Sequence, residues 1–264
     1  MTRGRSLFVD PPATPPTLED CTFYHSMDLP GLGLQAGAWD LRDHYDEYFG
    51  GHDFTGERVL DLGTASGALA FEMERRGARE VIGFDLDDGL NYDCRLPVDE
   101  AALAGRRKTV HRTKNGFWLA RRALGSHVSV AYGHVRHLPA DLGQFDTVMM
   151  GNILQHLQDP IGAVLQAIQR TRHLIITEAD WLPGHGDDLA CMIMYDELKP
   201  WSWYQVKPGL LQNLLRRWGF TEQALSWHTQ VLLRESTFTE TGRQTWVPLS
   251  VPTKHFTLSA RKKS

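Results

Sequence analysis

The stretch RVLDLGTASGALAFEMERRGAREVIGFDLD, residues 58–87, constrains the fold more than any other part of this chain. A short apolar run leads into a glycine-containing turn and a helical pattern, and a second apolar run then ends at Asp85. This succession is typical of a βαβ unit, in which a crossover helix joins two parallel strands. Ligands of open α/β sheets bind at the carboxyl ends of such strands, so the turn and Asp85 are expected at a binding site.

Short apolar runs alternate with helical patterns along most of the chain, which indicates further βαβ units. A proline and a glycine bracket a late helical pattern, PGLLQNLLRRWGF. The sequence therefore predicts an α/β fold: a Rossmann-like, mostly parallel seven-stranded sheet flanked by helices, with an N-terminal lid and a helical insertion after the second strand. The predicted strands cover residues 58–62, 81–84, 128–132, 147–150, 174–177, 224–233 and 255–260.

The predicted domain organisation has three parts. Residues 1–20 are expected to be a flexible, proline-rich leader, and residues 21–56 a lid with a short helix over 39–48. Residues 57–264 are expected to form the core, with the insertion at about 88–126.

The composition limits the classes of protein to which the chain can belong. Hydrophobic residues make up 42% and charged residues 23%, and no apolar run approaches the ~20 residues that a membrane span needs. Because the N-terminus has no secretory pattern, a cytoplasmic protein that binds no membrane is expected. The three cysteines, Cys21, Cys94 and Cys191, lack the spacing of a zinc site or a redox pair, so buried free thiols and no metal are expected.

The charge balance gives no general reason to expect nucleic-acid binding, since the net charge is −4 and the pI is near 6.3. One basic segment, residues 106–114 with the later Arg121 and Arg122, is the exception. It fits a phosphate-bearing partner, and it fits a solvated helix face at least as well.

The sequence of the turn, DLGTASG, distinguishes between two classes of nucleotide-binding site. A dinucleotide fold uses G-x-G-x-x-G, whose second glycine admits a pyrophosphate at a helix N-terminus. Here the glycines are four residues apart and follow an aspartate, and the pattern resembles the D-x-G-x-G-x-G turn of class I S-adenosylmethionine (SAM) methyltransferases. The resemblance implies SAM as cofactor and S-adenosylhomocysteine (SAH) as product. The implied cofactor contacts in the turn are Asp61, Gly63, Thr64, Ala65 at the central glycine position, and Gly67.

Two further positions follow from the same resemblance. Asp85, at the end of the second strand, is placed to accept hydrogen bonds from both ribose hydroxyls, with Leu86 beside it.

A second motif, GQFDTVMMGNILQHLQDPIGAVLQAI, resembles the fourth strand and the following loop of the same superfamily. It implies that Gly151 contacts the cofactor and that His156 lies at its methyl end. Methyl transfer is an in-line displacement with reacting atoms ~3–3.5 Å apart, and a hydroxyl nucleophile must lose a proton as it attacks. A histidine with a pKa near ~6.5 suits the role of base, so His156 is the candidate catalytic residue. The alternative is that His156 only shapes its loop by hydrogen bonds to the backbone.

FYHSMDLPGLGLQAGAWDLR and ERRGAREVIGFD resemble the branch of the family that contains the tRNA wobble-uridine 5-oxyacetate methyltransferases, over residues 23–220. Gln155 stands where those enzymes have a tyrosine that helps to hold the extra carboxylate of carboxy-SAM. This difference favours ordinary SAM as the donor, although a glutamine amide can also donate to a carboxylate. His134 replaces their acidic residue for the adenine amino group, so backbone groups near Val135 are expected to recognise adenine. GRQTW, with Arg243, resembles a late arginine motif of those enzymes.

Several aromatic and charged residues are candidates for the cofactor or the substrate. Trp39 and Arg42 lie where relatives contact the cofactor from the lid side, and Arg42 suits the SAM carboxylate; a surface ion pair is the alternative. Tyr24 and His25 are candidates to cover the sulfonium or to meet the substrate, and packing within the lid is the alternative. Glu178 either orients substrate or caps a helix. Trp201, Trp203 and Tyr204 form either a wall of the substrate site or part of the core.

The sequence therefore predicts a SAM-dependent methyltransferase, with O-methylation of a small-molecule or sugar hydroxyl as the favoured reaction. N-methylation of a small molecule is a close alternative. A tRNA-modifying enzyme is a second hypothesis, supported by the arginine-rich segment and opposed by the net negative charge. A non-catalytic SAM-binding protein is a third hypothesis.

Overall fold

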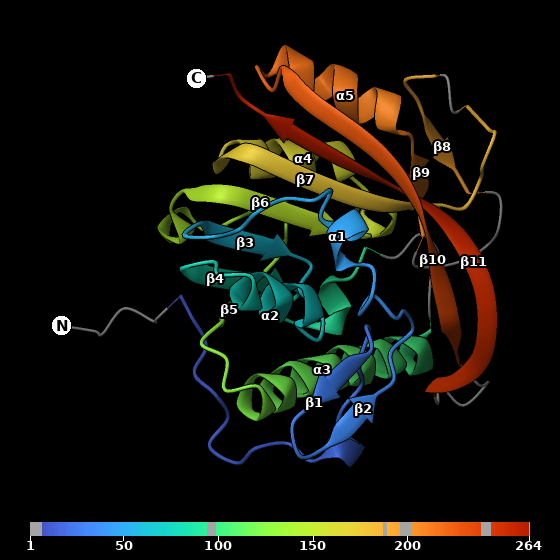
Figure 1. Cartoon of the computed structure of the whole chain (residues 1–264). Helices are drawn as coiled ribbons and strands as arrows, with labels where there is room; N and C mark the ends of the chain where they lie inside the picture. The colour runs from blue at the N-terminus through green and yellow to red at the C-terminus, as the bar shows by residue number, and fades with distance from the viewer. Residues whose placement is uncertain (1–6, 94–98, 187–188, 196–201, 239–243, 264) are drawn as a thin grey trace.

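The computed structural model describes residues 7–93, 99–186, 189–195, 202–238 and 244–263. Its centre is a seven-stranded sheet with the strand order β10-β11-β7-β6-β3-β4-β5 (Figure 1). The five strands from β3 to β7 run parallel to one another, whereas β11 runs antiparallel to both β7 and β10. The prediction of a mostly parallel seven-stranded α/β sheet is confirmed. The strands are β3 (Arg58–Leu62), β4 (Glu80–Asp85), β5 (Ser129–Tyr132), β6 (Phe145–Gly151), β7 (Thr171–Asp180), β10 (Glu222–Phe238) and β11 (Gln244–Arg261).

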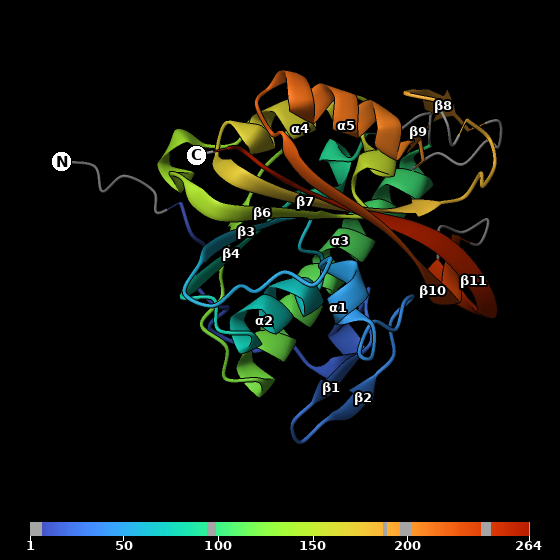
Figure 2. The same ribbon diagram turned by 45° about the horizontal axis from the view of Figure 1, so that its top comes forward.

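Helices cover both faces of the sheet, as expected for parallel βαβ units. α4 (Pro160–Ile168) and α5 (Pro208–Arg217) lie on one face, while α2 (Ala68–Arg75) and α3 (Glu100–Ala123) lie on the other (Figure 2). Successive residues of a strand point to opposite faces. Leu60 and Leu62 of β3 accordingly join the core beneath α4 and α5, and Val59 joins the core on the α2 side.

The segment predicted to hold a helical insertion contains one long crossover helix. α3 has 24 residues and follows the short 3-10 helix η2 (Gly89–Asn91). Arg112 of α3 donates hydrogen bonds to the carbonyls of Glu19 and Cys21 and so fixes the start of the lid. Among the described residues, no helix combines the length and the apolar character needed to cross a membrane.

The last two strands extend well past the edge predicted for them. β10 and β11 have 17 and 18 residues, but β11 pairs with β7 only from Lys254 to Arg261. The rest of the pair continues as a two-stranded arm that curves past the end of the sheet (Figure 1). The predicted strand bounds reflect the part of the hairpin beside β7, which ends at Asp180. The sequence pattern gives no indication of how far β10 and β11 continue beyond that point.

The segment 21–56, called the N-terminal segment below, lies between α3 and this arm. It contains the hairpin of β1 (Met27–Leu29) and β2 (Gly33–Gln35), and the helix α1 (Tyr45–Tyr48). The helix expected over 39–48 is therefore shorter than predicted. Trp39 instead forms a β-bridge with Leu232 of β10, which takes its backbone out of a helical conformation.

Four further short elements lie outside the main sheet. Two of them form a small hairpin above the carboxyl end of β7. They are β8 (Met192–Met194) and β9 (Tyr204–Val206), and the other two are the 3-10 helices η1 (Leu18–Asp20) and η3 (Ala140–Leu142).

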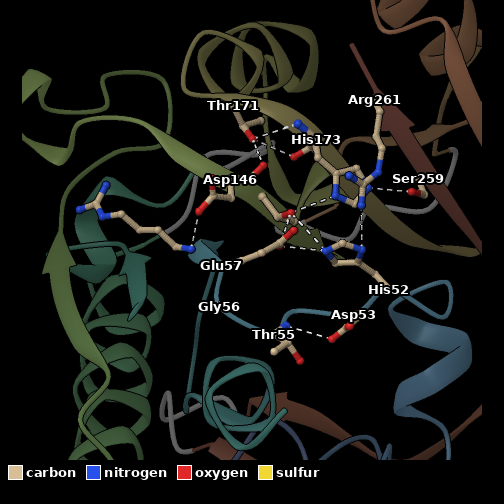
Figure 3. Close-up of polar contacts among 12 residues, drawn as sticks. His52, Asp53, Thr55, Gly56, Glu57, Asp146, Thr171, His173, Ser259 and Arg261 are labelled. Carbon is tan, nitrogen blue, oxygen red and sulfur yellow. Dashed lines mark hydrogen bonds and ion pairs between the residues drawn. The ribbon is translucent and has the colours of Figure 1, made fainter. Parts of the chain in front are cut away.

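A polar network ties the N-terminal segment to the amino-end side of the sheet (Figure 3). Arg261 donates to Nδ1 of His52 at 3.1 Å, and Arg261 has no acceptor, so Nδ1 carries no proton. The proton of His52 therefore lies on Nε2, 2.9 Å from the Glu57 carboxylate. Thr147 also donates to this carboxylate, at 2.7 Å.

The same network continues through the sheet to β11. The Thr147 hydroxyl proton is directed to Glu57, so its 2.9 Å contact with His173 Nδ1 has the histidine as donor. Nε2 of His173 then accepts from the Ser259 hydroxyl at 2.8 Å. Burial lowers the pKa of His173 to about 3, in agreement with a neutral ring. The network has a structural function, because it satisfies polar groups buried on the side of the sheet away from the glycine turn.

Candidate active site

The turn after β3 is built from residues in the left-handed backbone region. Gly63, Ala65 and Gly67 have φ values of 86°, 47° and 89°. The left-handed conformation at Gly63 favours glycine, and a Cβ atom there would also press on Cδ1 of Ile153, at 2.8 Å. Ala65 adopts a conformation that costs an L-residue about 1–2 kcal/mol. The turn thus presents backbone atoms rather than side chains to whatever lies above it.

Asp85, at the end of β4, is directed to this turn. Its Oδ2 atom accepts a hydrogen bond from the N–H of Ala65 at 2.6 Å, and Oδ1 accepts from the N–H of Leu86 at 2.7 Å. Burial raises the pKa of Asp85, while these two N–H groups and the Lys114 ammonium lower it. Each carboxylate oxygen has a second lone pair, so both oxygens can still accept from a pair of ribose hydroxyls.

A cavity lies beside this end of β4, against α3. Its volume is ≈ 490 Å³. Lys114 borders it, with Nζ 3.8 Å from the centre of the Tyr132 ring. The cavity mixes acidic and basic side chains, and it is lined by Asp87, Asp88, Gly89, Ala104, Arg107, Lys108, Val110, His111 and Lys114.

Asp61 is fully buried beneath the turn. Neither of its carboxylate oxygens makes a well-formed hydrogen bond to the described residues, and the same is true of the Thr64 hydroxyl. Burial raises the pKa of Asp61 to about 7, the nearby Thr64 hydroxyl lowers it, and the Asp85 carboxylate raises it further. A buried carboxylate that makes no well-formed hydrogen bond to the described residues is a candidate partner for a polar group of a ligand.

The N-terminal segment contacts the turn directly. The N–H of Tyr24 donates to the Ser66 hydroxyl at 3.0 Å. The ring of His25 lies edge-on to that of Tyr24, at 4.9 Å between centres, and its residue is 5% exposed. Trp39 is buried beside them, with its ring 5.2 Å from that of His255. Tyr24, His25 and Trp39 are therefore brought to the same edge of the sheet as the glycine turn.

The loop after β6 is held by a buried acid. Glu178 accepts a 2.7 Å hydrogen bond from the N–H of Leu154. Burial raises the pKa of Glu178 to about 8, while the N–H groups of Leu154, Gln155 and Ile153 lower it. Of the two roles expected for Glu178, these contacts correspond to the cap, because they close the 3-10 helix η4 (Leu154–His156).

His156 and Trp203 meet at a segment that the sequence did not single out, Tyr92 and Asp93. The His156 ring lies edge-on to the Tyr92 ring at 6.1 Å. The indole N–H of Trp203 donates to the Asp93 carbonyl at 2.9 Å, and the backbone N–H of Trp203 donates to the Gln155 carbonyl at 2.7 Å. His156 thus lies half-buried beside the Tyr92 ring, in the loop after β6.

His134 joins the same segment. Its Nε2 atom is 3.4 Å from the Asp93 carboxylate, and its Nδ1 atom accepts from the N–H of Arg136 at 3.2 Å. Both ring nitrogens are thus engaged by the chain. Val135 is buried, and adenine recognition by the backbone near it stays a prediction.

The remaining candidates lie elsewhere or outside the described residues. Arg42 forms 2.7 Å ion pairs with Asp28 and Asp40 at the surface, which is the alternative considered for it. Tyr204 packs against the core beneath α4 and α5. Trp201, Arg243 and Cys94 lie outside the described residues, and the other two cysteines are free thiols, Cys21 buried and Cys191 partly buried.

The residues at the carboxyl ends of β3, β4 and β6 fit SAM. The turn presents backbone atoms, Asp85 offers acceptors for two hydroxyls, and the Asp61 oxygens make no well-formed hydrogen bond to the described residues. When bound, SAM would supply an activated methyl group. Within the described ranges, no group of three or more histidine, cysteine, aspartate or glutamate residues is arranged to hold a metal ion.

Sequence reasoning missed three residues of this site: Tyr48, Asp93 and Asn152. Asn152 has a φ of 51°, and its side-chain amide N–H donates to Nε2 of His255 at 3.2 Å, which connects the end of β6 to β11. Tyr48 and Asp93 belong to no recognised motif, and Asn152 lies within the second motif, which assigned it no role. The only available signal was the density of aromatic residues around Tyr48 in DHYDEYFGG.

Comparison with known proteins gives a family match and several distant relatives. The model of the family described as "Methyltransferase domain" matches residues 40–230. A tRNA U34 carboxymethyltransferase from Ectopseudomonas mendocina (strain ymp) is 27% identical over 175 residues, which are 64% of this chain and 47% of that protein. A ubiquinone biosynthesis O-methyltransferase from Dinoroseobacter shibae (strain DSM 16493 / NCIMB 14021 / DFL 12) is 32% identical over 108 residues, covering 41% of this chain and 34% of that protein. The chain therefore spans less than half of either relative.

A solved structure supports the same fold. The N-terminal domain of EvdMO1, crystallised in the presence of SAH and D-fucose, superposes with a TM-score of 0.53. The two chains are 15% identical, and 93% of each is covered. With the family match and the strand order described above, the resemblance to class I SAM-dependent methyltransferases is confirmed, and this chain belongs to the methyltransferase domain family.

Proposed function

We propose that this protein transfers the methyl group of SAM to a hydroxyl group of a small molecule or a sugar, with His156 as the general base. The observation that carries the proposal is the position of His156 directly after the carboxyl end of β6, in a loop that the Glu178 carboxylate holds in place. A base must be positioned before its pKa matters, and a loop held by a buried acid provides that positioning. Glu178 acts here as a positioning residue.

The surroundings of this edge favour a small acceptor. Aromatic rings line it from several elements: Tyr92, Trp181 and Trp203, with the buried Trp39 from the N-terminal segment. Such rings suit an apolar molecule or the face of a sugar ring better than a phosphate backbone. The name of the O-methyltransferase relative from Dinoroseobacter shibae agrees with oxygen as the methylated atom.

The test is methyl transfer by the purified protein with SAM and a panel of small hydroxyl compounds, followed as SAH release. His156→Ala is expected to lower the rate with the best acceptor by ~10²-fold or more. His137→Ala, at an exposed histidine of the neighbouring loop, is the matched control and is expected to keep the wild-type rate. An unchanged rate for His156→Ala would rule out His156 as the general base. Binding of SAH without turnover of any acceptor would favour the non-catalytic alternative.

A tRNA substrate is the second candidate function. It is supported by the basic side chains of α3 at the cavity described above, Arg107, Lys108 and Lys114, and by the name of the relative from Ectopseudomonas mendocina. Two acidic residues, Asp87 and Asp88, line the same cavity, and Arg107 is paired with Asp88. An RNA acceptor predicts methyl incorporation into bulk tRNA that falls steeply as salt rises.

A further inference from the structure

We propose that the methyl acceptor is a phenol whose aromatic ring stacks on the indole of Trp181, and that the side-chain amide of Gln155 donates a hydrogen bond to an oxygen atom on that ring. Trp181 is then a specificity-determining residue, and the acceptor narrows from hydroxyl compounds in general to aromatic ones. This inference rests on the proposed function, since it describes the second substrate of the same reaction.

Trp181 lies next to the loop of the candidate base. It follows Asp180, the last residue of β7. The strand order places β6 between β7 and β3, and β3 carries the glycine turn. The indole N–H of Trp181 donates at 2.9 Å to the side-chain oxygen of Gln155, the residue before His156. An acceptor bound beside His156 therefore has Trp181 within reach, on the side of β6 that lies away from the glycine turn.

Three contacts hold the Trp181 ring in place. Its indole N–H is bound by Gln155, and its backbone N–H donates to the Gln205 side-chain oxygen at 2.8 Å. The ring also packs against that of Trp39, at 5.9 Å between centres and 51° between planes. Trp39 is only 4% exposed, whereas Trp181 stays partly exposed. A large ring that is fixed and still accessible offers apolar area to a ligand at little cost in side-chain entropy.

Gln155 supplies a hydrogen-bond donor beside this ring. The residue is 7% exposed. Because an indole N–H can only donate, the atom of Gln155 that meets Trp181 is the amide oxygen. The amide nitrogen points away from the indole, and it donates to none of the described residues. An oxygen atom of a ligand can therefore accept from it.

Other polar side chains near the end of β7 are already engaged by the chain, which favours a phenol over a sugar. The Gln205 side-chain oxygen accepts from Trp181 and from the Tyr195 hydroxyl. The Gln205 amide nitrogen donates to the Ala179 carbonyl at 3.0 Å, and both ends of the Asn152 amide are bound. A sugar has several hydroxyls, which would exchange their hydrogen bonds to water for too few to the protein. The face of an aromatic ring needs no such partners.

A phenol also suits a histidine base. A phenolic hydroxyl has an ordinary pKa near ~10, as in tyrosine, which is far below that of an aliphatic alcohol. The phenolic oxygen forms the bond to the methyl carbon, whose bond to sulfur breaks with the electron pair left on sulfur, and the phenolic proton passes to the His156 imidazole. The positive charge of the sulfonium is thus replaced by that of the imidazolium.

The test is isothermal titration calorimetry of the SAH-loaded protein with neutral phenols and their saturated counterparts. The pairs are phenol with cyclohexanol, catechol with 1,2-cyclohexanediol, and 2-naphthol with decahydro-2-naphthol, and methyl α-D-glucopyranoside represents the sugars. Phenols are expected to bind about tenfold more tightly than their saturated counterparts and than the glucoside.

Variants then assign the preference to named side chains. Trp181→Leu is expected to weaken catechol binding about tenfold and to leave the affinity for SAH unchanged, while Trp181→Phe keeps most of the catechol affinity. Gln155→Glu keeps an acceptor for the Trp181 indole but removes the donor, so catechol binding should weaken by about the same factor. Trp218→Leu, at a tryptophan that is 49% exposed after α5, is the control and should bind catechol and SAH as the wild type does.

Three results would overturn the inference. They are binding of a saturated counterpart or the glucoside as tightly as the phenols, binding of no phenol at all, and wild-type catechol affinity in Trp181→Leu. Failure of the proposed function gives a different result, because no hydroxyl compound of any class would then release SAH from SAM. Methylation of a sugar and of no phenol would leave the proposed function standing and remove only this assignment.

Discussion

The Asp85 carboxylate accepts a 2.6 Å hydrogen bond from the backbone N–H of Ala65, which joins the end of β4 to the turn after β3. Ala65 occupies the position at which the related turn has its central glycine, and its φ of 47° lies in the left-handed region. The hydrogen bond stabilises that conformation without a glycine. It also aims the carboxylate at the space above the turn, where the ribose of SAM is expected.

Replacement of Asp85 is expected to weaken the nucleoside end of the site. Asp85→Ala removes acceptors for two ribose hydroxyls, so the affinities for SAH and 5′-methylthioadenosine should both fall tenfold or more. Calorimetric titration measures both values. Asp88→Ala, three residues away and paired with Arg107, is the control. Wild-type affinity in Asp85→Ala would contradict the assignment.

Gly63 is expected to tolerate no side chain. A Cβ atom there would meet Ile153 at 2.8 Å, and the φ of 86° disfavours any L-residue. Gly63→Ala should therefore lower the free energy of unfolding by about 1–3 kcal/mol, as measured by urea denaturation. Adding Ile153→Ala removes the steric contact but leaves the backbone strain. The double variant should therefore recover only that part of the lost free energy of unfolding that the contact causes. A double-mutant cycle with no coupling between the two positions would be inconsistent with this contact.

The pKa of Asp61 predicts a pH dependence of stability in the cofactor-free protein. The folded-state value, about 7, lies above the ordinary value of 3.8 because the carboxyl is buried. The protonated group stabilises the fold fully below pH ~4, and this contribution is lost as the pH rises through ~7. The loss amounts to at most about 4 kcal/mol.

Asp61→Asn isolates this effect, since the amide does not titrate. Its free energy of unfolding relative to wild type should rise between pH ~4 and pH ~8 in urea titrations at several pH values. Saturating SAH should reduce the slope, because an ammonium beside Asp61 favours the charged carboxylate. A difference between the two proteins that stays constant with pH would refute the assigned burial effect.

The network on the opposite side of the sheet should affect stability and not binding. Thr147→Val leaves the partly exposed Glu57 and the buried His173 without the hydroxyl that joins them at 2.7 and 2.9 Å. We expect a loss of about 1–3 kcal/mol in the free energy of unfolding and an unchanged affinity for SAH. Thr147→Ser keeps the hydroxyl and should recover most of the stability. Loss of SAH affinity in Thr147→Val beyond what its stability explains would contradict a purely structural network.

The fold could be predicted because its signals are local. β3 begins and ends at the predicted residues, and the turn, Asp85 and the loop of His156 follow from short motifs. The length of β10 and β11 could not be predicted, because beyond β7 the two strands pair mainly with each other. The predicted start of the helix over 39–48 was wrong for a similar reason, because a β-bridge to Leu232 holds Trp39 in an extended conformation.

The site was only partly predictable because its closing residues come from distant parts of the chain. Asp93 brings His134 and Trp203 together, and its role depends on contacts with residues about 40 and 110 positions away. Tyr48, from the N-terminal segment, lies against Gly151 at the end of β6. Such contacts leave no periodicity or spacing in the sequence, so only the three-dimensional arrangement identifies them.

The most direct measurement is the crystal structure of the protein with SAH. The account predicts the ribose hydroxyls within hydrogen-bond distance of Asp85 and the homocysteine end beside Asp61 and the glycine turn. It also predicts the sulfur atom on the side that faces His156. SAH bound elsewhere, or in the opposite direction across the turn, would contradict the account.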